Sequence, residues 1–411
     1  PTVEPLRFVV GAEGDEVQAV MGGLGHGSPR YVAWSVRRVR FTDAMPKAAV
    51  VEVQAGDRTV RVSSPDRVIY EATDSTPEVT KLMVAEYFVA VEDGLMRALR
   101  ERPTALERWT SGVRPGMKLA TSRMAQSSRG EDADAFYQKR VPKGAPDYLE
   151  SVEITFPSGR TADEICPTEI AVPVWCAHMG TLTFHPWPVR RSDVDRPDEL
   201  RIDLDPQPGT SFVDAVSVAG GARELLEELG LRGYVKTSGN RGVHIFVRIE
   251  PRWEFLDVRH AAIGFGRELA RRDPGVTVDW WKEERGERIF VDFNQNCRDR
   301  TIASAYSLRP IPGAPVSTPL TWEELAGVSD PRELNLFTVP ERLAASGDAW
   351  ATIDDTAHSI EPLLALYDEL PGGEMPFPPD YPKMPGEPPR VQPSKKVEEH
   401  WDADGHWIGP S

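Results

Sequence analysis

The stretch Leu200-Arg-Ile-Asp-Leu-Asp-Pro-Gln-Pro208 decides the fold expected for this chain. Its apolar run, closed by a proline, predicts a strand. Side chains two positions apart share one face of a strand, so Asp203 and Asp205 point the same way while Ile202 and Leu204 point into the core. Two carboxylates held together repel each other, and a divalent cation is the usual reason for a protein to keep them so.

A third carboxylate, Asp292, lies in a second strand-like run, Arg288-Ile-Phe-Val-Asp-Phe-Asn294. Two carboxylates on one strand and a third from a distant strand make the ligand set that two-metal nucleotidyl transfer requires. Because the Asp-x-Asp pattern is short, spacing alone leaves a second interpretation equally open. In that interpretation the pair flanks a turn and caps local backbone groups.

Strands and amphipathic helices alternate between these two runs. The pattern predicts helices over 214–229 and 255–272 and strands over 233–238 and 243–249. With the flanking carboxylate strands, this gives the order β-α-β-β-α-β of ferredoxin-like units. We therefore predict an α/β fold of the α+β kind, with a mostly antiparallel central sheet, an RRM-like or ferredoxin-like half and flanking helices.

Weaker patterns lie on either side of this middle part. Alternation around Gly56-Asp57 predicts a hairpin over 50–62. Helical periodicity predicts one helix over 80–100 and further helices over 320–345 and 352–370. From residue 375 the chain is dense in proline, which indicates an extended or disordered tail.

The net charge of −16 argues against a generally basic nucleic-acid coat protein, but it leaves room for a local basic channel. Residues 105–145 interleave cations with rings, which suits phosphates and bases of a nucleic-acid strand. A solvated loop with two core aromatics explains the same composition equally well. The residues concerned are Arg108, Arg114, Lys118, Arg123, Arg129, Lys139, Arg140 and Lys143 with Trp109, Phe136 and Tyr137.

The three cysteines indicate no disulfide framework, which fits a reducing compartment. Cys166 and Cys176 with His178 are a possible metal set, but buried thiols are the better interpretation. The sequence has no long apolar segment and no signal-like start, so we expect a soluble, cytoplasmic, nucleoid-associated protein without a membrane partner.

The segment Lys236-Thr-Ser-Gly-Asn-Arg-Gly-Val-His244 offers groups that suit a triphosphate. Ser238 ends one predicted strand and His244 begins the next, with free backbone amides expected in the turn and charge supplied by Arg241. Taken alone, this spacing is a weak signal, and a core histidine is the better interpretation.

The combination of these segments resembles the three motifs of the archaeo-eukaryotic primase superfamily, and most closely the polymerase domains of bacterial ligase D end-joining proteins. Thr183-Phe-His-Pro-Trp187 and Tyr306-Ser-Leu-Arg309 match family segments that contact the nucleotide through a histidine and the triphosphate through an arginine. Phe136-Tyr-Gln-Lys139 matches a segment near the template. Pro65-Asp-Arg-Val-Ile-Tyr70 with Thr80-Lys81 matches the segment that receives the template's 5′-phosphate.

The resemblance covers about 63–335 and implies a polymerase domain there, with a β-rich extension over 1–62 and a C-terminal helical segment and proline-rich tail over 336–411. It implies Asp203, Asp205 and Asp292 as catalytic ligands of two Mn²⁺ or Mg²⁺ ions. It implies nucleotide and DNA contacts by His185, Ser238, Arg241, His244 and Arg309 and by Arg67, Lys81, Phe136, Tyr137 and Lys139.

This chain departs from the family pattern at three positions. The family usually has lysine where this chain has Arg67, asparagine where it has Ser64, and often a second arginine where it has Ile311. A planar guanidinium and a compact ammonium bind phosphate with different geometry, so recognition of a recessed 5′-phosphate is expected to be weaker than in the family.

The resemblance implies a metal-dependent, template-directed polymerase that fills short gaps in DNA repair, accepts NTPs as well as dNTPs, and works with DNA and with repair proteins such as a separate ligase. Because no Lys-x-Asp-Gly ligase motif is present, we expect a stand-alone polymerase. A primase that starts chains de novo is an alternative with the same chemistry. An inactive nucleic-acid-binding scaffold and a metal-dependent phosphohydrolase are alternatives of other classes.

Overall fold

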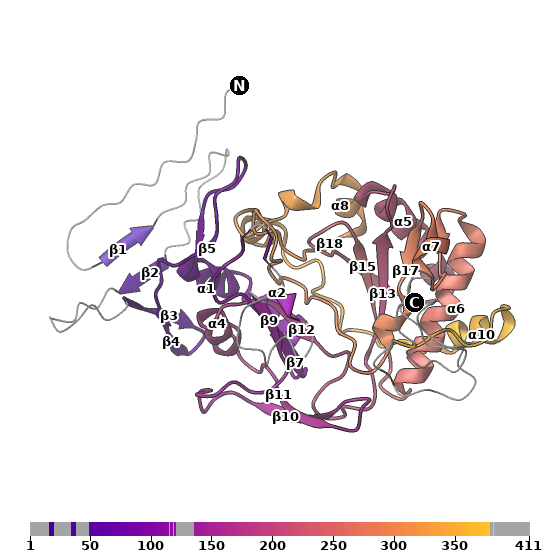
Figure 1. The fold of residues 1–411 in the computed structure, drawn as a ribbon, viewed down its shortest axis with the longest axis horizontal. Coiled ribbons are helices and arrows are strands. Elements are labelled where there is room, and N and C mark those ends of the chain that lie inside the picture. Colours follow the sequence, from indigo (N-terminus) through magenta and orange to yellow (C-terminus); the bar gives the residue numbers. More distant parts are fainter. Residues whose placement is uncertain are drawn as a thin grey trace, which may run out of the picture.

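The computed structural model describes residues 16–19, 34–37, 49–114, 116–117, 119–120, 135–378 and 381. This part of the chain forms two lobes that lie side by side, each built around its own six-stranded sheet (Figure 1). The first lobe comes from the N-terminal half and the second from residues after about 198. The predicted class, a mixed fold with mostly antiparallel strands, is confirmed, and the strands are divided between two sheets.

The sheet of the first lobe has the order β10-β11-β7-β9-β8, with β12 also paired to β7. Its strands are β7 (Thr104–Arg108), β8 (Leu119–Ala120), β9 (Ala135–Gln138), β10 (Ser151–Thr155), β11 (Thr161–Ile165) and β12 (Thr181–Pro186). Two small hairpins precede it: β3 (Val50–Ala55) with β4 (Arg58–Ser63), as predicted, and β5 (Val68–Tyr70) with β6 (Val79–Thr80). Helices α1 (Lys81–Ala90), α2 (Glu92–Leu99) and α4 (Ala171–His178) complete this lobe.

The prediction of one helix over 80–100 is wrong. The helix is interrupted at Val91, whose φ of −109° and ψ of 20° lie outside the helical range. The break lets α2 lie against Tyr306, so close that a Cβ built on Gly94 would be 2.1 Å from the Tyr306 ring. Helical hydrogen bonds continue on both sides of Val91, from Val91 N to Tyr87 O and from Leu95 N to Val91 O, so periodicity alone cannot reveal the break.

The sheet of the second lobe has the order β16-β17-β13-β15-β14-β18 and is antiparallel except between β16 and β17. Its strands are β13 (Glu199–Pro206), β14 (Gly233–Thr237), β15 (Val243–Arg248), β16 (Val276–Thr277), β17 (Ile289–Val291) and β18 (Pro319–Leu320). With α5 (Phe212–Glu228) and α6 (Phe255–Arg272), the run from β13 to β17 is the predicted β-α-β-β-α-β unit.

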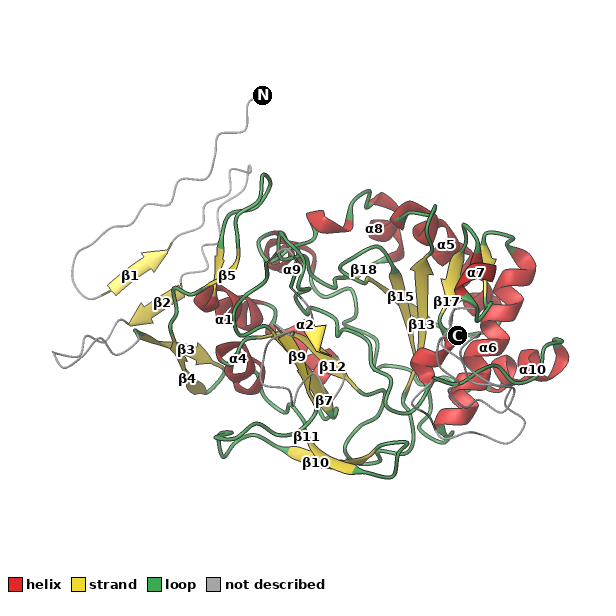
Figure 2. Cartoon of the chain, viewed as in Figure 1, coloured by secondary structure: helices red, strands yellow, loops and turns green. Residues whose placement is uncertain are grey.

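The two faces of the second sheet have different roles. Leu200, Ile202 and Leu204 of β13 are buried in one apolar cluster with residues of α5 and α6. Because side chains alternate along a strand, Asp203 and Asp205 are on the opposite face, away from these helices. Figure 2 shows α5 and α6 on the outer side of this sheet and the first lobe on the other side. The carboxylates are therefore held on the face that looks toward the first lobe.

A short helix, α7 (Lys282–Arg285), precedes β17. The segments after β17 connect and cover both lobes: η1 (Phe293–Asn296), α8 (Trp322–Gly327), η2 (Pro331–Glu333), α9 (Thr338–Ser346) and α10 (Glu361–Glu369). The prediction of helices over 320–345 and 352–370 is partly correct. The first range holds α8 and most of α9, separated where Val328 is extended and Asp330 with Pro331 starts a 3-10 turn, and the second is helical only over α10. The domain borders at 62/63 and 335/336 stay predictions. No helix in the described ranges has the length and apolar character needed to span a bilayer.

Residues 372–378, here named the C-terminal strap, run across α6 to η1. Arg259 of α6 has a fully buried side chain that donates to Glu374 and to the carbonyls of Met375 and Pro376. Asn294 of η1 accepts from Arg259 and donates to Pro376 O at 3.1 Å. The strap thus packs against the element that follows Asp292. The rest of the predicted proline-rich tail lies outside the described residues.

Replacing Glu374 by alanine is expected to destabilise the protein by about 1–3 kcal/mol, because the buried Arg259 guanidinium loses its carboxylate partner. Burial opposes ionisation of Glu374, yet His260 and Arg259 lower its pKa to about 2. The stabilisation is therefore present above the unfolded pKa of about 4.3 and is lost as pH falls toward 2. Urea denaturation at pH 7 measures the loss, with the exposed Glu369→Ala as control. Equal losses for both variants would contradict the importance of this contact.

Candidate metal and nucleotide site

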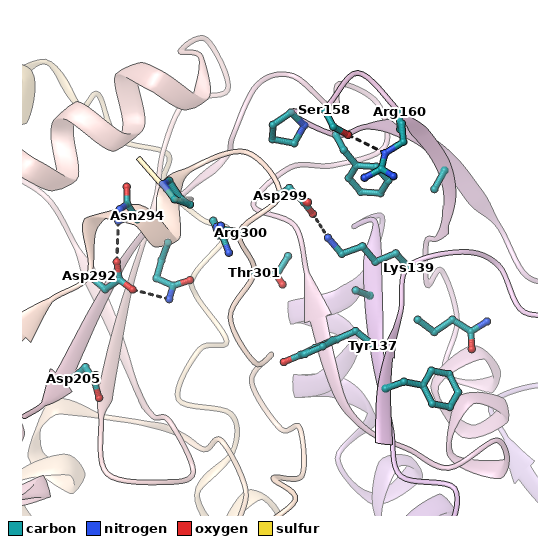
Figure 3. A pocket seen from close by; sticks show the side chains of 18 of the residues that line it. Tyr137, Lys139, Ser158, Arg160, Asp205, Asp292, Asn294, Asp299, Arg300 and Thr301 are labelled. Atoms are coloured by element: carbon teal, nitrogen blue, oxygen red, sulfur yellow. Dashed lines mark hydrogen bonds and ion pairs between the residues drawn. The ribbon is translucent and has the colours of Figure 1, made fainter. Parts of the chain in front are cut away.

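Adjacent strands of the second sheet bring the three predicted carboxylates together. Asp203 and Asp205 lie on β13, and Asp292 follows β17, which pairs with β13. The backbone N–H of Asp292 donates to the carbonyl of Asp203 at 3.0 Å. Asp205 and Asp292 line a cleft of about 1050 Å³ whose other wall belongs to the first lobe (Figure 3). The geometry thus joins residues from the two runs that the sequence singled out.

The carboxylates are held where ionisation is unfavourable. Burial raises the pKa of Asp203 to about 6, against the opposing effect of Lys236 and Arg309. Burial and then the charge of Asp203 raise the pKa of Asp292 to about 6 and also raise that of Asp205. Uncompensated repulsion of this kind is relieved by a cation.

Backbone and side-chain amides of the protein donate hydrogen bonds to these carboxylates. Asp292 accepts from Asn294 N at 3.1 Å and from Gln295 Nε2 at 3.0 Å, and the amide of Gln295 also lowers the pKa of Asp203. Asp205 accepts from Gln207 Nε2 at 3.3 Å. Gln295, three residues after Asp292, lies in the matched family segment, but no role was assigned to it from the sequence.

The donor set fits a hard divalent cation. Carboxylate oxygens are the ligands that Mg²⁺ and Mn²⁺ prefer, and three of them meet here in a partly desolvated place. Within the described residues, no three histidine, cysteine or carboxylate groups converge closely enough to hold a metal as they stand. Binding one ion by all three carboxylates therefore requires their oxygens to come closer together than they are here.

The cysteines form no part of this site. Cys166, Cys176 and Cys297 are all buried and free of disulfides, which agrees with the buried-thiol interpretation. His178 uses Nδ1 to accept from the Ser63 amide at 3.2 Å.

The predicted triphosphate segment forms a closed turn beside Asp203. His244 pairs with Asp203 in the strand register, and its Nε2 lies 3.3 Å from Asp203 Oδ1. Ser238 Oγ accepts from the amides of Asn240 at 3.2 Å and Gly242 at 3.0 Å. The expectation that the turn offers free amides is therefore wrong for these two, because the serine hydroxyl satisfies them.

Two arginines lie next to this turn. Arg241 donates to Pro206 O at 3.4 Å and lowers the pKa of Asp205, although burial and Asp203 outweigh it. The Arg309 side chain packs against Gly239, and its buried Nε has no hydrogen-bond partner within the described ranges. Burial, followed by Lys236 and Arg309, lowers the pKa of His244 well below its usual value, so the ring is neutral at pH 7. The turn thus combines a neutral imidazole with guanidinium groups.

His185 lies on β12 of the first lobe and is 5% exposed. Its Nε2 is 2.9 Å from Glu107 Oε2, and its ring meets that of Tyr137 edge-on at 4.9 Å. Glu107 also accepts from Trp109 Nε1. Glu107 was missed because its partnership with His185 depends on the pairing of β7 with β12.

The wall of the cleft opposite the carboxylates carries the predicted template residues. Phe136, Tyr137 and Lys139 all line the cleft, and Figure 3 shows Tyr137 and Lys139 facing Asp205 and Asp292 across it. Lys139 forms an ion pair with Asp299 and lies 4.9 Å from the Phe156 ring centroid. Lys118, Arg123 and Arg129 of the basic-aromatic segment lie outside the described residues.

The two cations predicted to receive a 5′-phosphate lie together in the first lobe, outside this cleft. Lys81 is buried and donates to His178 O at 3.1 Å, and burial together with Arg67 lowers its pKa. Arg67 is exposed and donates to Thr110 O at 2.9 Å. Ser64 has φ of 50°, a left-handed conformation that suits asparagine better than serine. The left-handed backbone conformation at this position would therefore explain a preference for asparagine.

Comparison with known proteins gives one consistent result. The family model of the LigD primase-polymerase domain matches residues 80–350. The multifunctional non-homologous end joining protein LigD of Pseudomonas aeruginosa is 31% identical over 318 residues, which cover 76% of this chain and 35% of that protein. Its namesake in Mycolicibacterium smegmatis is 31% identical over 306 residues, covering 72% and 36%.

A solved structure, the polymerase domain from Mycobacterium tuberculosis ligase D in complex with DNA, matches with a TM-score of 0.61 and 26% identity. The match covers 73% of this chain and 99% of that domain. The chain thus spans about a third of the length of the two curated relatives and nearly the whole of the solved domain.

Proposed function

Because this chain belongs to the LigD primase-polymerase domain family, we propose that it is a template-directed nucleotidyltransferase that extends DNA primers across short gaps during repair. Polymerase domains of this family are metal-dependent nucleotidyltransferases. The observation that carries the proposal is that Asp205 and Asp292 line one interlobe cleft, with Asp203 on the same strand face as Asp205 and backbone-bonded to Asp292. The ion, the nucleotide and the DNA structure given below are parts of the same proposal.

Asp203 and Asp205 would hold both ions, and Asp292 would complete the ion nearest the primer terminus. Bound there, Mn²⁺ or Mg²⁺ lowers the pKa of the primer 3′-hydroxyl and neutralises charge on the triphosphate and the leaving pyrophosphate. The raised pKa values of Asp203 and Asp292 support this role, because a site that disfavours its own charge gains most from a cation.

The nucleotide is bound from the side of β14 and β15. The Nε–H of Arg309 has no hydrogen-bond partner among the described residues. The charge of Arg309 lowers the pKa of both Asp203 and His244, so the guanidinium lies close to both side chains. It and Arg241 bind phosphate oxygens, with Ser238 and His244 as neutral partners. His185, held by Glu107, orients the nucleotide from the first lobe.

The template strand lies along the opposite wall. Phe136 and Tyr137 offer ring faces for bases, and Lys139 offers charge for phosphate. DNA bound here places its 3′-terminus between the two lobes. The solved ligase D polymerase domain named above was obtained with DNA, which supports DNA as the partner.

Lys81 and Arg67 are proposed to hold the 5′-phosphate at the far side of the gap. Because Ser64 and Arg67 replace the family's asparagine and lysine, we propose a weaker preference for that phosphate than a well-matched pocket gives. Sealing the filled gap requires a DNA ligase activity as partner.

Primer extension on gapped DNA tests this function. We expect metal-dependent incorporation, with rNTPs used at least as well as dNTPs and Mn²⁺ favoured over Mg²⁺. Gaps with a 5′-phosphate should be bound about tenfold more tightly than gaps without it, and Lys81→Ala should remove the difference at fixed salt. Nucleotide hydrolysis without incorporation would refute the polymerase assignment. Extension with no phosphate effect in the wild type would instead favour general primer extension or priming.

A further inference from the structure

A lysine lies directly beneath the nucleotide side of the site and touches no carboxylate. Lys236 of β14 has 0% exposure, and none of the described carboxylates lies within ion-pair distance of it. Its Nζ is 2.8 Å from His244 Nδ1 and 2.6 Å from Ser317 Oγ. A buried amine without a carboxylate partner is costly to keep. No nucleotide can reach it, so any effect on the nucleotide passes through a neighbour.

The direction of each hydrogen bond around this lysine is fixed by its partners. Ser317 Oγ donates its hydrogen to Thr237 O at 2.9 Å, so it accepts from Lys236. At the far side of the imidazole, Nε2 faces Asp203 Oδ1 at 3.3 Å. A carboxylate only accepts, so the ring hydrogen lies on Nε2 and the bare Nδ1 accepts from Lys236.

We propose that Lys236 is a positioning residue that holds His244 in the Nε2–H tautomer, so that the ring presents a hydrogen-bond donor to the phosphate of an incoming nucleotide. This inference rests on the proposed function and deepens it. When Asp203 turns to bind an ion, the Nε2–H is released toward the cleft. A ring with the hydrogen on Nδ1 would instead present a lone pair to phosphate oxygens, which repel it.

A purely structural role for Lys236 is the competing explanation. The lysine also lies 5.6 Å from the Phe246 ring centroid and joins β14 to the loop before β18. If filling this space were its only task, methionine, which has similar length and no donor, would preserve both the tautomer and nucleotide affinity. The two explanations therefore differ in what Lys236→Met does to the imidazole.

The decisive measurement is the tautomer of His244, read from long-range ¹H–¹⁵N spectra of histidine-labelled protein without metal or nucleotide. His244→Gln identifies the signal among the eight histidines. The wild type is expected to show only the Nε2–H form. In a pair of proteins that carry Asp203→Ala, so that no carboxylate at Nε2 fixes the hydrogen, the protein with Lys236 should keep the Nε2–H form and Lys236→Met should populate the Nδ1–H form. In parallel, nucleotide affinity should fall about tenfold in Lys236→Met, with KM rising more than kcat falls.

Ser317→Ala is the matched control, because it removes the other contact of Lys236 and leaves its bond to His244 in place. It should keep the wild-type tautomer and affinity. An Nδ1–H tautomer in the wild type overturns the proposal even if Lys236→Met fails to fold. An unchanged tautomer and affinity in Lys236→Met overturn it as well. The expected tautomer in a protein that cannot incorporate nucleotides would refute the polymerase function instead.

Discussion

Replacing Asp203 by asparagine is expected to abolish nucleotide incorporation while making the metal-free protein more stable at pH 7. Asparagine keeps the shape of the side chain and removes the charge that binds the ions. We expect incorporation to fall by roughly a thousandfold or more, the scale seen when a group that stabilises transition-state charge is removed. The same loss is expected for Asp205→Asn, since both carboxylates belong to the same ligand set.

The gain in stability follows from the direction of the pKa shift. The pKa of Asp203 is raised by burial to about 6 in the folded protein, above the unfolded value of about 3.9. The folded state therefore holds its proton more tightly, and stability falls as pH rises from about 4 through 6. At pH 7 the full penalty is present, about 3 kcal/mol, and asparagine removes it. Asp292, with a pKa also raised to about 6, adds to the same trend.

Thermal melting between pH 4 and 8, with and without Mn²⁺, measures this trade-off. Wild-type protein should gain stability from Mn²⁺ above pH 6, and Asp203→Asn should gain little. Asp74→Asn is the control for loss of one negative charge, because Asp74 is exposed and does not line the cleft. A variant that melts well below the wild type would mean that activity was lost by unfolding. Primer extension by Asp203→Asn at the wild-type rate would refute the two-metal assignment.

Local sequence was sufficient to predict the main strands and helices of the second lobe, from β13 to α6 and β17. Its strands are short apolar runs closed by proline or glycine, and its helices begin at capping residues such as Ser211. Strand periodicity and helix capping each depend on about ten neighbouring residues. Periodicity therefore located β13 and placed Ile202 and Leu204 in the core. The shared face of Asp203 and Asp205 followed from strand geometry alone.

Most of the features that were missed depend on contacts between distant segments. Glu107 meets His185 because β7 pairs with β12, and Lys236 meets Ser317 across 81 positions. The close packing of Tyr306 against Gly94 of α2 likewise joins segments more than two hundred positions apart. In the first lobe, β8 and β9 are short and follow an irregular segment, so alternation there gives almost no signal. Residue type and spacing can identify candidate ligands, but only the tertiary structure shows which residues hydrogen-bond to those ligands and orient them.

Replacing Arg102 by methionine is expected to produce the largest loss of stability among single changes outside the cleft. Arg102 lies between α2 and β7 in the first lobe, and its guanidinium has 0% exposure. It donates to Asp198 at 2.6 and 2.9 Å and lies 2.9 Å from Glu199 Oε1. Glu199 is the first residue of β13, the strand that carries Asp203, and Asp198 comes immediately before it. The ion network therefore ties the first lobe to the base of the catalytic strand.

The expected cost is about 3 kcal/mol, because breaking a buried ion pair leaves charge in a place without water. This is the lower end of the range for such pairs, since Arg248 lies 3.2 Å from Asp198 and 3.0 Å from Glu199 and remains in place. Despite burial, Arg102, Arg201 and Arg248 lower the pKa of Glu199 to about 2. The network stabilises the protein above the unfolded pKa of about 4.3 and loses this effect as pH falls toward 2.

Urea denaturation of Arg102→Met at pH 7 and pH 3 checks both the size and the pH dependence of this loss. The variant should be less stable by about 3 kcal/mol at pH 7, and the difference should shrink at pH 3, where the carboxylates begin to bind protons. Arg223→Met is the matched control, because Arg223 pairs with Glu227 on the exposed face of α5 and such pairs contribute at most about 0.5 kcal/mol. Similar losses in the two variants, or a loss at pH 3 as large as at pH 7, would show that packing of the methylene chain rather than charge joins the lobes at this point.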